Sequence, residues 1–183
     1  MPDHPDAREV ERIHHDLLER WRGAMNLVGP GSTDIHFADA RAVAQRLDAT
    51  GRWADLGSGA GFPGVAMAAW NPAADVCLVE SRAKRAAFLK RVVQQARLSN
   101  ATVHHGRVEG LEPRTWDGII SRAFAAPEAV LEHARRLLVP KGRLVLMLAK
   151  ERVEPPDDFS LEIRQEYRVC GRDRCLTALR FLG

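Results

Sequence analysis

A run of glycines directly after a short apolar segment constrains this chain more than any other feature. Residues 53–65 read WADLGSGAGFPGV and hold four glycines within eight residues. Glycine adopts backbone conformations with positive φ and lets a ligand lie against the main chain. In a parallel α/β sheet, the turn after the first strand faces the ligand crevice. The stretch therefore predicts a strand, a ligand-binding turn and a helix whose free N–H groups suit a carboxylate or phosphate.

Short apolar runs alternate with helical patterns from residue 52 onward. The expected strands and helices, in chain order, are 52–57, helix 62–70, 75–80, helix 82–97, 101–105, 116–121, a helix that begins near Pro127, and 142–150. Such alternation is typical of βαβ units in a mostly parallel sheet. Residues 162–170 and 174–182 lie only three residues apart and predict an antiparallel hairpin at the sheet edge. The sequence thus predicts seven strands.

Two helices are expected before the first strand. Apolar residues recur at helical spacing over residues 7–22, which indicates an amphipathic helix. After a break, Ser32 or Thr33 can cap a second helix that runs to about Asp48. These helices form an N-terminal two-helix preface to the sheet.

The chain has 183 residues, enough for one domain that buries roughly 70% of its unfolded surface. Hydrophobic residues make up 45% and charged residues 28%, with no repeat or low-complexity tract, so disorder is expected at most at the ends. We expect a single α/β domain over 1–183, with the helical preface at 1–50 and the core at 51–183.

Composition also bears on compartment and partners. The chain start has neither a basic nor an apolar signal region, and no segment approaches the roughly 18 apolar residues of a membrane span, so a cytoplasmic location without membrane contact is expected. Cys77, Cys170 and Cys175 lack C-x-x-C spacing, which supports neither disulfides nor a metal site. The net charge of +3 permits a polyanionic partner without requiring one, and nothing demands more than a monomer.

Two acidic residues help to identify the ligand of the glycine turn. Residues 59–64 match G-x-G-x-x-G, a pattern of dinucleotide-binding proteins, but the match alone is weak. Asp55 ends the first strand, where it can meet a cationic amino group and would repel a pyrophosphate. Glu80 ends the second strand and can accept both hydroxyls of a ribose, which fits either ligand. Asp55 therefore favours S-adenosylmethionine over a nicotinamide dinucleotide.

Four stretches in a fixed order are more specific than the turn alone: DLGSGAGFPG at 55–64, ESRAKRAAFL at 80–89, RVE at 107–109 and SRAFA at 121–125. Together they resemble the bacterial small-subunit ribosomal RNA guanine-N7 methyltransferase family, also called glucose-inhibited division protein B. The similarity extends over nearly the whole chain. It implies a Rossmann-like fold that uses S-adenosylmethionine, with a guanine N7 of 16S ribosomal RNA, free or in the small ribosomal subunit, as methyl acceptor.

The resemblance also implies particular site residues. Carried onto matching positions, the family's cofactor contacts fall at Gly57, Phe62, Val108, Glu109 and Arg122. The residues themselves add four to this predicted cofactor site, namely Asp55, Gly59, Gly61 and Glu80.

The acceptor side needs positioning rather than a catalytic base. Guanine N7 already holds an accessible lone pair, so its attack on the sulfonium methyl requires mainly alignment, and no catalytic residue is predicted. Arg122 can pair with the donor carboxylate or a phosphate, and Phe124 can stack on an extruded base.

Two stretches depart from the family pattern. Residues 35–40 read IHFADA where the family often has Arg-His-x-x-Asp-Ser, and Lys150-Glu151 stands in place of Lys-Gly. These changes bear on RNA contacts and the exact target more than on donor binding. Within the first stretch, His36 and Asp39 lie three apart on one helical face, which predicts a structural hydrogen bond.

Other functions remain open at this stage. A methyltransferase that acts on a small molecule or protein fits the modest net charge, and a non-catalytic, cofactor-binding ribosome-associated module fits the altered second helix. A nicotinamide oxidoreductase remains a more distant reading of the glycine pattern.

Overall fold

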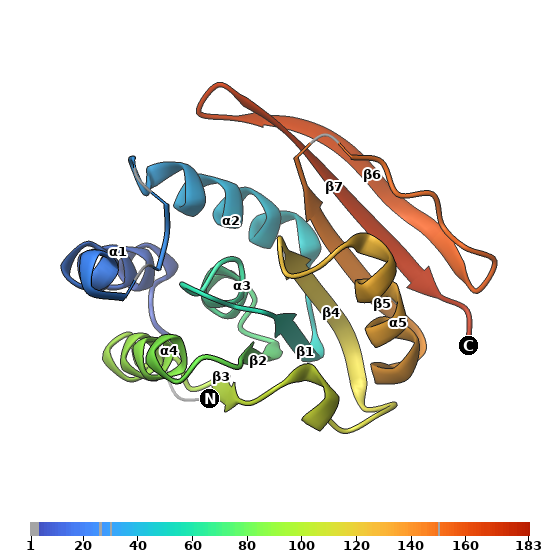
Figure 1. The fold of residues 1–183 in the computed structure, drawn as a ribbon, viewed down its shortest axis with the longest axis horizontal. Helices are drawn as coiled ribbons and strands as arrows, with labels where there is room; N and C mark the ends of the chain where they lie inside the picture. The colour runs from blue at the N-terminus through green and yellow to red at the C-terminus, as the bar shows by residue number, and fades with distance from the viewer. Residues whose placement is uncertain (1–3, 26, 30, 150) are drawn as a thin grey trace.

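The computed structural model describes residues 4–25, 27–29, 31–149 and 151–183. Within these residues, seven strands form one sheet in the order β3-β2-β1-β4-β5-β7-β6 (Figure 1). The strands are β1 (Gly51–Leu56), β2 (Ala74–Glu80), β3 (Ala101–His105), β4 (Trp116–Arg122), β5 (Leu138–Leu148), β6 (Phe159–Val169) and β7 (Arg172–Phe181). The helices are α1 (Ala7–Met25), α2 (Asp34–Leu47), α3 (Gly64–Trp70), α4 (Ala83–Gln95), α5 (Pro127–Leu137) and the 3-10 turn η1 (Val108–Gly110).

The direction of the strands follows the prediction. The pairs β1–β2, β2–β3, β1–β4 and β4–β5 are parallel, whereas β7 runs antiparallel to both β5 and β6. The seven-stranded, mostly parallel α/β sheet with an antiparallel C-terminal hairpin at its edge is therefore confirmed. After β3 the chain returns to place β4 beside β1, and ligands of such sheets bind at the carboxyl ends of the strands near this reversal.

Helices cover both faces of the sheet (Figure 1). The preface helices α1 and α2 pack with α3 and α4 over one face, and α5 and η1 cover the other. Successive side chains of a strand point to opposite faces, so Trp53 joins the first core and Ala54 joins the second. Because β1 is covered on both sides, four consecutive residues from Trp53 to Leu56 are buried rather than every second one.

Several element ends differ from the predicted ones. Helix α1 continues to Met25, and α2 begins after Thr33, whose side chain makes no capping bond. Ser32 Oγ instead accepts the N–H of Asp34 at 3.1 Å. The hairpin turn is shorter than predicted because strand pairing continues to Val169 and Arg172.

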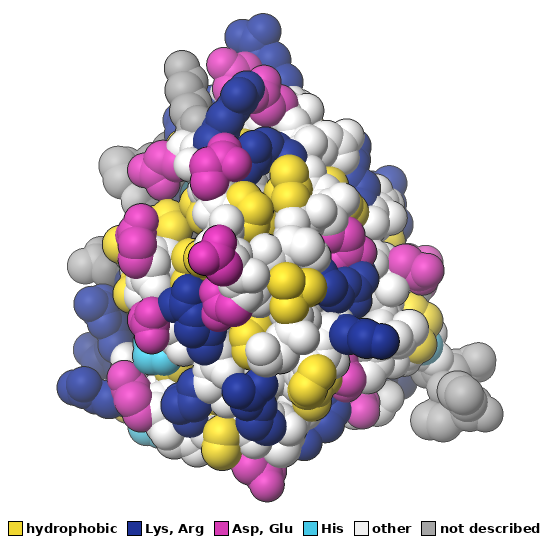
Figure 2. All heavy atoms as spheres, turned by 90° about the vertical axis from the view of Figure 1, so that its right-hand side faces the viewer, with side chains coloured by type: hydrophobic (Ala, Val, Ile, Leu, Met, Phe, Trp, Pro, Cys, Tyr) yellow, Lys and Arg dark blue, Asp and Glu magenta, His cyan; other side chains and the backbone are white. Residues whose placement is uncertain are grey.

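The face that lies on the right of Figure 1, over β6, β7 and α5, carries Lys and Arg interspersed with Asp and Glu (Figure 2). The side chains on this face therefore do not carry charge of a single sign. Across the residues that the structure describes, no helix is both long and apolar enough to cross a membrane.

Candidate active site

The glycine turn has the backbone that its sequence predicts. Gly57, Gly59 and Gly61 all have positive φ, at 71°, 57° and 95°. Space is also limiting, because a Cβ on Gly57 would lie 2.5 Å from Cδ2 of Phe124. Gly64 has an ordinary φ, but a Cβ there would lie 2.5 Å from Oδ2 of Asp55. Glycine is thus required at this turn both for its conformation and for its size.

A cavity of about 410 Å³ opens where β1, β2, β3 and β4 end, and this volume suits a small-molecule ligand. We call it the donor cavity. Its wall consists of Gly57, Val79, Glu80, Ser81, Arg82, Arg85, Gly106, Arg107, Val108, Glu109, Ala123 and Phe124. Five residues that the sequence singled out therefore meet here, although they come from four separate stretches of chain: Gly57, Glu80, Val108, Glu109 and Phe124.

Glu80 is held firmly in the wall of the donor cavity. Its side chain is almost fully buried, with the N–H of Gly59 donating to Oε2 at 3.1 Å and the N–H of Arg82 donating to Oε1 at 2.7 Å. Each carboxylate oxygen can accept a further hydrogen bond. Glu80 therefore joins the glycine turn to the start of α4 and can still receive donors from a ligand.

Asp55 lies beneath the glycine turn and is not part of the cavity wall. The residue is 0% exposed, and its Oδ2 accepts the N–H of Gly64 at 3.1 Å. Oδ1 is buried without a hydrogen-bond partner among the described residues. Burial raises the pKa of Asp55 to about 6, against the effect of its hydrogen bonds. The structure thus gives Asp55 a bracing role, and its contact with a cationic amino group stays a prediction.

Phe62 packs away from the cavity, against the preface. It is buried, and its ring centroid lies 4.8 Å from that of Phe37 and 4.9 Å from that of His14. Burial lowers the pKa of His14 to about 4, so the ring is neutral and its Nε2 donates to the carbonyl of Ala60 at 2.7 Å. Helix α1 therefore holds the glycine turn from behind through His14.

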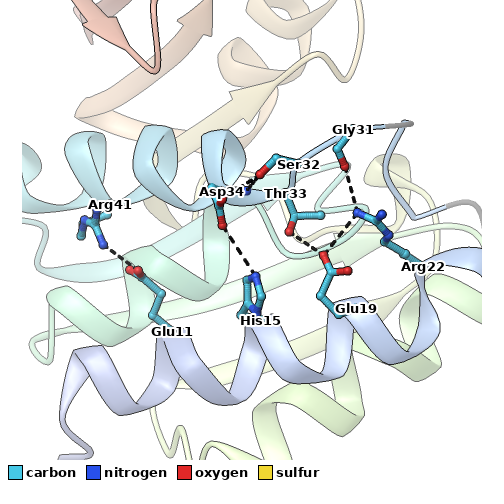
Figure 3. Close-up of polar contacts among 9 residues, drawn as sticks. All are labelled: Glu11, His15, Glu19, Arg22, Gly31, Ser32, Thr33, Asp34 and Arg41. Atoms are coloured by element: carbon cyan, nitrogen blue, oxygen red, sulfur yellow. Dashed lines mark hydrogen bonds and ion pairs between the residues drawn. The ribbon is translucent and has the colours of Figure 1, made fainter.

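Polar contacts fix α1 against α2 on the outer side of this packing (Figure 3). Glu11 pairs with Arg41 at 2.6 Å, and Glu19 accepts the hydroxyl of Thr33 at 2.6 Å. Since both helices also pack on α3, which follows the turn, the preface forms one support for it.

Arg122 lies at the end of β4 within a partly buried polar cluster. Its guanidinium carbon is 5.1 Å from the ring centroid of Phe62, and its Nη1 donates to Nδ1 of His36 at 3.3 Å and lies 3.8 Å from Oδ2 of Asp39. The predicted His36–Asp39 hydrogen bond is wrong for the described residues. Both side chains turn toward Arg122 instead, because a guanidinium offers several donors to these acceptors.

The C-terminal hairpin completes this cluster. The hydroxyl of Tyr167 donates to Oδ1 of Asp39 at 2.7 Å, and Nε of Arg174 lies 3.5 Å from its Oδ2. Asp39 thus joins α2 to β6 and β7 as well as to β4.

Comparisons with known proteins agree with this geometry. Residues 10–168 match the family described as GidB, rRNA small subunit methyltransferase G. The chain belongs to this family. Proteins named ribosomal RNA small subunit methyltransferase G are 34% identical in Pseudomonas paraeruginosa, over 95% of this chain and 89% of theirs, and 36% identical in Pseudomonas entomophila, over 90% and 82%. The resemblance found in the sequence is confirmed.

Solved structures share the fold of this methyltransferase G family member at low sequence identity. A putative methylase from Haemophilus influenzae is 15% identical with a TM-score of 0.60, over 78% of this chain and 93% of that one. TYW2 of M. jannaschii, solved in complex with AdoMet, is 12% identical with a TM-score of 0.63, over 82% and 77%. The Rossmann-like methyltransferase fold is thus confirmed.

The structure divides the predicted cofactor residues of this methyltransferase G family member into two groups. Gly57, Glu80, Val108 and Glu109 line the donor cavity. The others are not in the cavity wall: Gly59 and Gly61 form the turn, and Asp55, Phe62 and Arg122 support it or lie beside it. Among the residues that the structure describes, no three His, Cys, Asp or Glu side chains form a group that could hold a metal.

Sequence reasoning missed three supporting residues. His14 was visible only as part of an apolar helical stripe, and no local pattern singled out Tyr167 or Arg174. Their contacts join segments far apart in the chain: 46 residues separate His14 from Ala60, and 128 separate Tyr167 from Asp39. Lys150, one of the two residues at the second departure from the family pattern, lies outside the described residues.

Proposed function

We propose that this chain transfers the methyl group of S-adenosylmethionine to N7 of a guanine in 16S ribosomal RNA. The family match over residues 10–168 carries the proposal. The donor cavity supports it, because Gly57 and Glu80 stand at the ends of β1 and β2, where such folds bind nucleotides. The enzyme is proposed to act as a cytoplasmic monomer on ribosomal RNA or the small ribosomal subunit.

The residues of the donor cavity fit S-adenosylmethionine. The free lone pairs of Glu80 suit the two ribose hydroxyls, and Gly57 presents bare backbone to the cavity. Val108 is buried and apolar, and with Glu109 it forms the wall expected to meet the adenine. When bound, the donor supplies an electrophilic methyl group.

Phe124, in the wall of the donor cavity, is the residue proposed to stack on the acceptor base. It follows β4, lines the cavity and is only partly buried, so one face of its ring can meet a ligand. An extruded base stacked on this ring would be held near the donor methyl. Because the N7 lone pair needs no deprotonation, holding the two atoms at about 3–3.5 Å is the main task of the protein.

Labelled methyl transfer tests the proposal. The protein would be incubated with methyl-labelled S-adenosylmethionine and small ribosomal subunits that lack N7-methylguanosine, and the RNA would then be digested for mass spectrometry. We expect label in 7-methylguanosine with the native chain, and none with Gly57→Asp. Gly31→Asp is the matched control, because this glycine before α2 also has positive φ, at 111°, but has open space around it. Donor binding without labelled RNA would contradict the proposed acceptor and leave the donor site standing.

A further inference from the structure

A second cavity, of about 520 Å³, lies between the end of β5 and the hairpin and shares no residue with the donor cavity. We call it the hairpin groove. It is lined by Ala149, Arg152, Glu166, Tyr167, Arg168, Asp173, Arg174 and Cys175. Strand β7 supplies Asp173, Arg174 and Cys175, and it lies beyond the segment matched to the family.

Strand register places the hairpin groove at the same edge of the sheet as the donor cavity. Arg122 of β4 pairs with Met147 of β5, and the next residue of β5, Leu148, pairs with Cys175 of β7. Neighbouring strands lie about 4.8 Å apart, so the end of β4 and the start of β7 are separated by roughly 10 Å. A nucleotide chain whose target base enters beside Phe124 would have its flanking phosphates within reach of the groove.

The exposed arginines of the hairpin groove can exchange their carboxylate partners for a phosphate. Arg152 pairs with Glu166 at 2.6 Å, with side chains 64% and 67% exposed. Arg168 lies 3.7 Å from Asp173, and these side chains are 72% and 61% exposed. Exposed pairs of this kind are weak, and a phosphate can replace a carboxylate on arginine with two parallel hydrogen bonds.

Arg174 supplies a fixed positive group beside these exposed arginines. It and Arg122 share a single carboxylate, that of Asp39, which is 4% exposed and also accepts the Tyr167 hydroxyl. Two guanidinium groups on one carboxylate leave a surplus of positive charge. Burial lowers the pKa of His36, and the nearby charge of Arg122 lowers it further, so this imidazole does not compete as a cation.

We propose that the hairpin groove binds a backbone phosphate of the acceptor RNA, next to the nucleotide whose base enters the donor cavity. Arg152, Arg168 and Arg174 are the phosphate ligands, and Asp39 and Tyr167 hold the groove in register with Arg122. The inference rests on the proposed function, because it takes RNA as the acceptor. It agrees with the mixed charge of the face over β6, β7 and α5 (Figure 2), since binding then depends on a local group of arginines rather than on a broad basic surface.

The test compares two double variants of the full chain that lose equal charge. Arg152→Gln/Arg168→Gln removes the exposed phosphate ligands, and Arg20→Gln/Arg114→Gln removes two exposed arginines from α1 and from the loop before β4. Binding to naked 16S RNA is measured by filter retention between 50 and 200 mM salt, alongside the Kd for S-adenosylmethionine.

We expect the groove variant to bind RNA roughly tenfold or more weakly at 0.1 M salt, with the slope of log affinity against log salt smaller by about 0.7–0.9, the value for one lost phosphate contact. The control variant should keep the native slope, and both should keep the native donor affinity. Equal slopes in all three proteins would overturn the inference. RNA binding that depends on the groove without labelled 7-methylguanosine would instead refute the proposed function alone.

Discussion

Replacement of Gly57 by alanine should destabilise the fold and weaken donor binding through one identifiable contact. The new Cβ would lie 2.5 Å from Cδ2, 3.1 Å from Cγ and 3.2 Å from Cβ of Phe124, so the aromatic ring must move. Alanine at the positive φ of 71° costs about 1–2 kcal/mol, and forced repacking adds about 1–3 kcal/mol. The expected loss of unfolding free energy is about 2–5 kcal/mol.

Gly171→Ala separates these two contributions. Gly171 has a similar φ of 76°, but a Cβ there meets no atom within 4 Å. This control should therefore lose only the backbone contribution of about 1–2 kcal/mol. Urea unfolding followed by circular dichroism gives the free energies, and calorimetry gives the donor Kd, which we expect to rise at least about tenfold, or 1.4 kcal/mol, in Gly57→Ala alone.

A double-mutant cycle with Phe124→Ala identifies the contact itself. If the ring is the obstacle, truncating it should recover about 1–3 kcal/mol of the loss in Gly57→Ala, which appears as a coupling energy between the two sites. Equal destabilisation of Gly57→Ala and Gly171→Ala, together with zero coupling to Phe124, would refute the reasoning.

Three further variants test the supports of the site. Burial raises the folded pKa of Asp55 to about 6, so the unfolded carboxyl ionises first as pH rises. The native chain should therefore lose about 3 kcal/mol of unfolding free energy between about pH 4 and about pH 6. Asp55→Asn should abolish this pH dependence of the urea midpoint. Burial lowers the folded pKa of His14 to about 4, so the unfolded imidazole is protonated first as pH falls. The native chain should lose about 3 kcal/mol of unfolding free energy between about pH 6.5 and about pH 4, and His14→Gln should abolish this loss. An unchanged pH profile in either variant would contradict the assigned burial. Tyr167→Phe should lower the unfolding free energy by about 2 kcal/mol, because it removes a hydrogen bond to a carboxylate, and should leave the donor Kd unchanged; no loss on unfolding would show that the bond to Asp39 does not hold the hairpin.

Local patterns were sufficient for the framework of the fold. Residues 101–105 were predicted as a strand and form β3, and the first strand and the glycine turn also lie where expected. These features depend on side-chain periodicity and on the conformational freedom of glycine, which neighbouring residues already express. The turn of the hairpin was placed less well, because its length depends on how far two strands pair.

The residues of the candidate site also differ in whether local sequence patterns could predict their contacts. Gly57 and Glu80 were found from the sequence because the ends of β1 and β2 meet at one sheet edge. Phe62 packs on His14 and Arg122 faces Asp39, and their expected contacts with the cofactor or a phosphate stay predictions. No local signal could have distinguished these outcomes, since each depends on which distant side chain fills the space beside it.

The sequence by itself determined that this chain forms a mostly parallel α/β sheet, that a glycine turn follows the first strand, and that its motifs resemble those of a ribosomal RNA methyltransferase family. Only the tertiary structure decided that a preface histidine holds this turn and that Asp39 joins α2, β4 and the hairpin. The physical reason is distance along the chain: periodicity and turn chemistry act between near neighbours, whereas a buried ring or carboxylate takes its partners from whichever segments the fold brings together.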